Sequence, residues 1–147
     1  MADLAQAIRS AIVGSTAVVG VFPTVAGPGR CECATESQST VAANRHPRIW
    51  YIRSDESEEV DLSGCVGLCE SYWDLEVIDD DLATAQQISK VVRGQLNGKS
   101  GLMGSSLFSV QGVFVEDHSD DYIPGGVGAD SGEHVAALRL HIFNDST

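Results

Sequence analysis

The hydrophobic period changes from two residues to about 3.6 residues within residues 73–97, and this change constrains the fold most. From 73 to 78, apolar residues alternate with mostly acidic ones, which predicts a strand with one apolar face. Asp79, Asp80 and Asp81 then supply carboxylates that suit a helix N-terminus. Gly98 is expected to end this helix. Its apolar stripe consists of Leu82, Ala85, Ile88, Val92 and Leu96.

Further elements flank this strand and helix on both sides. A short amphipathic helix is expected from a capping box at Asp3 and Gln6 to a stop at Gly14, and a turn follows at Phe22 and Pro23. The apolar stripe of this first helix is Leu4, Ile8 and Ile12. Downstream, two strands are joined by a long, acidic, glycine-rich loop. This order predicts an α+β fold rather than a parallel α/β sheet.

We expect a four-stranded, largely antiparallel sheet that carries the two helices on one face. The predicted strands lie around residues 47–55, 66–78, 108–118 and 133–143. The predicted core comprises Trp73, Leu75, Val77, Leu82, Ile88, Val92, Leu96, Leu138, Leu140 and Ile142. The opposite face of the sheet is expected to carry Tyr72, Asp74, Glu76, Arg139 and His141.

Length and charge limit the classes of function. The chain has 147 residues, which suits a single domain over residues 1–147. Its net charge of −12 argues against nucleic-acid binding, which needs basic patches to neutralise phosphates. An acidic wall would still let DNA pass without adhering. No membrane span and no secretory signal are recognised, so synthesis in the cytosol is expected.

The four cysteines could form a tetrahedral zinc site. Structural zinc sites usually place two to four residues between paired cysteines, whereas the first pair here has the spacing C-x-C. The last cysteine also falls on the apolar phase of the strand at 66–78. We therefore favour reduced thiols, with zinc and a disulfide as the alternatives. The residues concerned are Cys31, Cys33, Cys65 and Cys69.

The sequence has two acidic clusters, and the second could hold a hard cation such as calcium or magnesium. This second cluster lacks the order of ligands found in a calcium-binding loop. We interpret the first as a solvated connection between two strands, and the second as a solvated hairpin tip that keeps an edge from pairing. The first cluster is Asp55, Glu56, Glu58, Glu59 and Asp61, and the second is Glu116, Asp117, His118, Asp120 and Asp121.

No catalytic motif is present, and we expect the protein not to be an enzyme. A thiol mechanism could pair Cys31, Cys33 or Cys65 with a histidine, but no local signature supports it. The histidines are His46, His118, His134 and His141. The glycine-rich segment 98–104 lacks the Walker spacing and follows a helix, so we predict a connection in which Leu102 and Met103 cover the helix end. No cofactor is expected.

Several patterns occur in a defined order along the chain. They are the N-terminal helix, VGVFP at 19–23, PRIWYIRSD at 47–55, the strand and helix at 73–98, VQGVFVEDHSDDYIPG at 110–125, and a hydrophobic C-terminal strand. In this order, over roughly two thirds of the chain, they resemble the tail-completion or tail-terminator (head-to-tail joining) proteins of long-tailed bacteriophages and prophages. Residues 24–46 depart from the family pattern as a longer, cysteine-containing loop insertion.

The resemblance implies a structural virion protein at the junction of tail and neck, made in the host cytoplasm. Such a protein caps the tail tube and joins the tail to the head connector as a homo-oligomeric ring, commonly a hexamer, through which DNA passes without specific binding. Its partners would be copies of itself, the tail tube protein, and connector or stopper proteins. The face with Tyr72, Asp74 and Glu76 would then line the lumen. The alternatives are a head-side neck adaptor or stopper, a zinc-binding interaction module, and a thiol enzyme.

Overall fold

The computed structural model describes residues 4–27, 30–33, 47–61, 64–103, 109–123 and 133–145, with the backbone alone described at 55–61, 64–69, 109, 123 and 145. The helices are α1 (Leu4–Val13), α2 (Thr16–Val21) and α3 (Leu82–Leu96). The strands are β1 (Cys31–Cys33), β2 (Arg48–Asp61), β3 (Gly64–Asp79), β4 (Gly101–Leu102), β5 (Ser109–Ile123) and β6 (Glu133–Asp145). Within these ranges, no helix combines the length and the apolar character that crossing a membrane requires.

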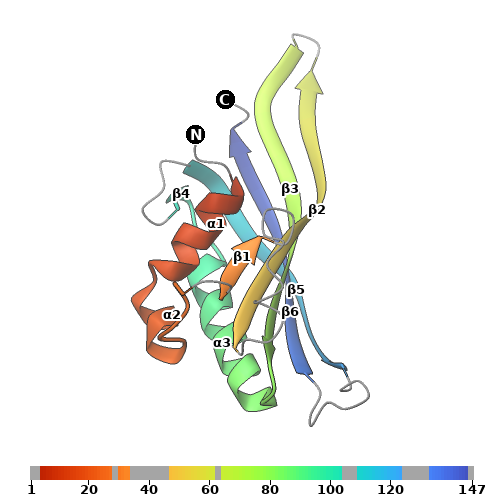
Figure 1. Cartoon of the computed structure of the whole chain (residues 1–147). Helices are drawn as coiled ribbons and strands as arrows, with labels where there is room; N and C mark the ends of the chain where they lie inside the picture. Colours follow the sequence, from red (N-terminus) through yellow and green to blue (C-terminus); the bar gives the residue numbers. More distant parts are fainter. Residues whose placement is uncertain are drawn as a thin grey trace.

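All six described strands form one curled sheet with the order β1-β2-β3-β6-β5-β4 (Figure 1). Only β1 and β2 pair in parallel, and the other neighbours are antiparallel. The three helices lie together on one side of the sheet (Figure 1). The sheet is therefore mixed, and one of its faces is covered by helices.

The expected four-stranded sheet with two helices is wrong, because the described chain has six strands and three helices. The two additional strands have only three and two residues, too few to produce a recognisable alternation. One of them, Cys31–Cys33, lies within the segment predicted to be a loop insertion. The additional helix α2 ends at Val21, directly before the predicted turn at Phe22 and Pro23. The hydroxyl of Ser15 caps this helix by accepting from the Val18 N–H at 3.3 Å.

Both acidic clusters lie within strands, so their interpretation as a connection and a hairpin tip is wrong. The backbone of β2 pairs with β3 from Asp55 opposite Tyr72 to Asp61 opposite Gly64. The second cluster belongs to β5 and lies along β6, from Asp117 opposite Arg139 onwards. Charged residues suit a strand that borders solvent, because they discourage pairing with another chain. Within the described part of the chain, β4 pairs with β5 only at Ser109 and Val110.

Helix α3 has the bounds that the hydrophobic period predicts. Asp81 is its N-cap, and one carboxylate oxygen accepts from the Thr84 N–H at 3.3 Å and from the Thr84 hydroxyl at 2.7 Å. The side-chain hydrogen bond from Thr84 lowers the pKa of the Asp81 carboxyl below its usual value. Gly98, with a φ of 81°, occupies the left-handed region just beyond the helix, which glycine adopts without strain.

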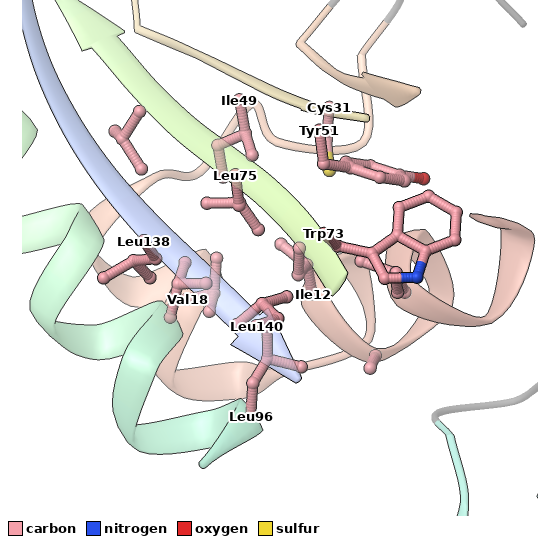
Figure 2. Close-up of a cluster of buried hydrophobic side chains, with 14 of the residues drawn as sticks. Ile12, Val18, Cys31, Ile49, Tyr51, Trp73, Leu75, Leu96, Leu138 and Leu140 are labelled. Atoms are coloured by element: carbon pink, nitrogen blue, oxygen red, sulfur yellow. The ribbon is translucent and has the colours of Figure 1, made fainter. Parts of the chain in front are cut away.

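The core lies between the three helices and the sheet (Figure 2). Nine of the ten predicted core side chains are at most 3% exposed: Trp73, Leu75, Val77, Ile88, Val92, Leu96, Leu138, Leu140 and Ile142. Leu82 was wrongly placed in the core, because it is 38% exposed. It is the first residue of α3, and the buried stripe of that helix begins one turn later at Ala85. In the segment after the helix, Met103 is buried but Leu102 is 57% exposed.

Hydrogen bonds attach the N-terminal segment to the sheet. The buried Tyr51 hydroxyl of β2 donates to the Ala5 carbonyl of α1 at 2.6 Å. The guanidinium of Arg9 donates to the Cys31 carbonyl of β1 at 3.0 Å. Both bonds join residues that are distant in sequence, so α1 is fixed against the β1–β2 end of the sheet.

Candidate functional site

The face of the sheet opposite the helices is the candidate functional site, and we call it the open face. The pairing register places its residues side by side, with Trp50 opposite Glu76 and Ile52 opposite Asp74. The open face is defined by Trp50, Ile52, Glu70, Tyr72, Asp74, Glu76, Phe114, Glu116, Arg139, His141 and Phe143. It contains both acidic and aromatic side chains.

The five residues expected on this face lie together on β3 and β6. Tyr72 is opposite His141 and Asp74 is opposite Arg139. The rings of Tyr72 and His141 are stacked, with centroids 4.1 Å apart and an interplanar angle of 18°. The guanidinium carbon of Arg139 lies 4.8 Å from the centroid of the Tyr72 ring, within cation–π range. Glu76, further along β3, is exposed. Their position in a lumen stays a prediction.

His141 contacts side chains from three strands. Its Nδ1 lies 2.8 Å from Glu116 Oε1 of β5, and its Nε2 lies 3.8 Å from Glu70 Oε1 of β3. Phe143 lies on the same face of β6, with its ring centroid 4.3 Å from that of His141. Phe114 of β5 packs edge-on against Phe143, with centroids 5.9 Å apart. The middle of the open face is therefore a set of contacting side chains around His141.

Sequence reasoning missed several residues of the open face, namely Trp50, Glu70, Phe114, Glu116 and Phe143. In β2 both faces are apolar, because Ile49 and Tyr51 alternate with Trp50 and Ile52, so alternation gives no signal there. Glu116 lies at a register shift between Val115 and Asp117, which no residue pattern marks. Val113, Phe114 and Val115 are likewise all apolar, so alternation gives no signal that would place Phe114 on the open face.

Two hollows of about 210 and about 200 Å³ flank the acidic side chains of β3. Both are lined by Asp74 and Glu76. The first also includes Asp117 and Arg139, whereas Trp50 and Ile52 line the second. The open face therefore offers carboxylates next to both a cation and apolar surface.

The cysteines of β1 are buried free thiols. Burial raises the pKa of the Cys31 thiol to about 12, so this thiol is protonated at neutral pH and unsuited to act as a nucleophile. For Cys65 and Cys69 the structure describes the backbone alone. Cys69 pairs with Glu58 of β2, whereas Cys33 pairs with Tyr51, so these two cysteines lie beside different stretches of β2. Among the described residues, no group of three or more histidine, cysteine and acidic side chains is arranged to hold a metal ion. His46 lies outside the described residues.

The chain shares its fold with a solved virion structure. No protein-family model matches the sequence, and no curated protein matches it. One chain of a structure titled as the virion of a native gene transfer agent particle superimposes on this protein with a TM-score of 0.69 and 14% sequence identity. The superposition covers 97% of this protein and 94% of the virion chain. A second solved structure has a lower TM-score of 0.47 at 14% identity, over 99% of this chain and 98% of that chain. The likeness to the virion chain covers the whole fold.

Proposed function

We propose that this protein is a structural component of a virion, where it forms a homo-oligomeric ring that caps the tail tube and joins the tail to the head connector. The observation that carries this proposal is the fold shared, over nearly the full length of both chains, with a chain of the gene transfer agent virion. The position at the tail end rests on the sequence pattern that resembles tail-completion proteins. The proposed site in the particle is the junction of tail and neck.

The geometry suits repetition around an axis. The sheet has different strands at its two edges, so contacts between copies of this chain that use both edges would be heterologous. A heterologous contact closes into a ring when its rotation permits, and a ring matches the rotational symmetry of a tube. Six copies are the number that the resemblance implies.

The open face has the charge expected of a surface past which DNA moves. Glu70, Asp74, Glu76 and Glu116 supply carboxylates, whereas Arg139 packs over the Tyr72 ring. A wall of like charge repels phosphates and so permits passage without adhesion. In the proposed ring the open face lines the lumen and the helices lie outside.

Purified protein, isolated tail tubes and isolated heads test this role. We expect negative-stain microscopy to show a ring at one end of each tube, and tubes so treated should join heads that untreated tubes do not join. Binding to heads without binding to tubes would indicate a head-side adaptor or stopper and would contradict the proposal. A protein that stays monomeric when tubes are added would contradict the ring.

A further inference from the structure

His141 lies between two rings and two carboxylates at the centre of the open face, and its side chain is only 13% exposed. Tyr72 and Phe143 supply the rings, whereas Glu70 and Glu116 supply the carboxylates. Because Glu70 is on β3, Glu116 on β5 and His141 on β6, a single imidazole connects three strands.

The two ring nitrogens of His141 have different surroundings. Nδ1 is within hydrogen-bond distance of Glu116, at 2.8 Å, and an ionised carboxylate can only accept, so Nδ1 carries the proton of the neutral ring. Nε2 then presents a lone pair. This nitrogen is buried and has no hydrogen-bond partner, and the nearest Glu70 oxygen is 3.8 Å away. A lone pair facing a carboxylate is unfavourable, whereas an N–H in the same place would be attracted.

We propose that His141 is a proton-operated clamp of the open face. When Nε2 takes up a proton, its contact with Glu70 becomes a charge-assisted hydrogen bond, and Nδ1 keeps its hydrogen bond to Glu116. The charged imidazole then connects β3 and β5 to β6. A shift of about 1 Å in the Glu70 side chain brings the 3.8 Å separation into the range of such bonds. This inference does not depend on the proposed role in a tail.

The charged groups around the imidazole set the direction of the pH effect. Glu70 from β3 and Glu116 from β5 favour the protonated ring, and Arg139 of its own strand, which packs on Tyr72, opposes it. The contact with Glu70 therefore stabilises the folded protein when the imidazole is protonated, and this contribution is lost when the pH rises and the ring becomes neutral.

Denaturant unfolding at pH 5 and pH 8 tests the clamp with a matched pair of variants. Glu70→Gln removes the carboxylate beside Nε2, whereas Glu76→Gln makes the same change in charge on the same strand and face without touching His141. Relative to Glu76→Gln, we expect Glu70→Gln to lower the folding equilibrium constant about 1.5- to 5-fold at pH 5, the range for partly exposed ion pairs, and not to lower it at pH 8. An equal difference at both pH values would overturn the proposal.

Nitrogen NMR of the unaltered protein gives an independent readout that requires no variant. At pH 8 the His141 ring should carry its proton on Nδ1, and at pH 5 on both nitrogens. A neutral ring with the proton on Nε2 at pH 8 would place the donor towards Glu70 instead of Glu116, and this result would also overturn the clamp.

Discussion

The two faces of strand β3 differ in their contacts, although their residues alternate along the same backbone. Trp73, Leu75 and Val77 are at most 3% exposed and pack under the helices, whereas Asp74 and Glu76 line hollows on the open face. Burial of large apolar side chains supplies most of the stability of a domain, and partly exposed charges supply little. The covered face therefore maintains the fold, and the composition of the open face can serve contacts with other molecules.

The largest expected effect tests this division directly. Trp73→Ala removes a buried ring, whose Nε1–H donates to the Ser71 hydroxyl at 3.0 Å, and should lower the free energy of unfolding by about 3–5 kcal/mol. Asp74→Ala, one residue away on the open face, should change it by less than about 0.5 kcal/mol. Denaturant titration of both variants measures the difference. The reverse order would mean that the two faces have been exchanged.

A smaller effect concerns the attachment of α1 to the covered face. Tyr51→Phe removes the 2.6 Å hydrogen bond to the Ala5 carbonyl and retains the ring, so the free energy of unfolding should fall by about 0.5–1.5 kcal/mol. Tyr122→Phe is the control on a side chain that is 49% exposed, and we expect almost no change from it. Equal losses in the two variants would show that the buried hydroxyl does not fix α1.

The smallest effect concerns the start of α3, the helix that lies over β3 and β6. Asp81→Ala removes the cap on the Thr84 N–H, so thermal unfolding should begin at a lower temperature than in the Asp80→Ala control. The pKa of Asp81 is lowered by the Thr84 hydrogen bond, so its contribution is full at neutral pH and is lost as the pH falls through that lowered pKa. A difference between the two variants that does not shrink in acid would contradict this account of the cap.

The parts of the fold that could be predicted are those with long, regular periods. Residue spacing predicts helix α3 directly. It also predicts which residues of β3 and β6 point towards the helices, because a strand that buries one face fixes the side of every residue in it. The same reasoning predicts that Tyr72, Asp74 and His141 share a face, and in the sheet Tyr72 lies opposite His141.

The rest depends on partners that are distant in sequence. Strands β1 and β4 exist because a longer neighbour supplies their hydrogen bonds, and their own residues carry no periodic signal. The acidic residues of β2 and β5 predict loops, because charge suggests exposure to solvent, but charge does not prevent pairing at a sheet border. The contact of Glu116 with His141 depends on a register shift, which only the assembled sheet displays.

Charge reversal on the open face tests most directly the claim that this face borders passing DNA. Asp74→Lys with Glu76→Lys would let the wall bind phosphates and release counterions, an attraction that weakens as salt rises. The matched control, Asp80→Lys with Asp120→Lys, makes the same change in charge at the start of α3 and beside Gln86 of that helix. Particle assembly is followed by microscopy, and DNA ejection by dye release over a salt series. The account predicts joined particles in both cases and slowed ejection only in the open-face variant, most severely at low salt. Normal ejection at every salt concentration, from particles shown to contain that variant, would contradict it.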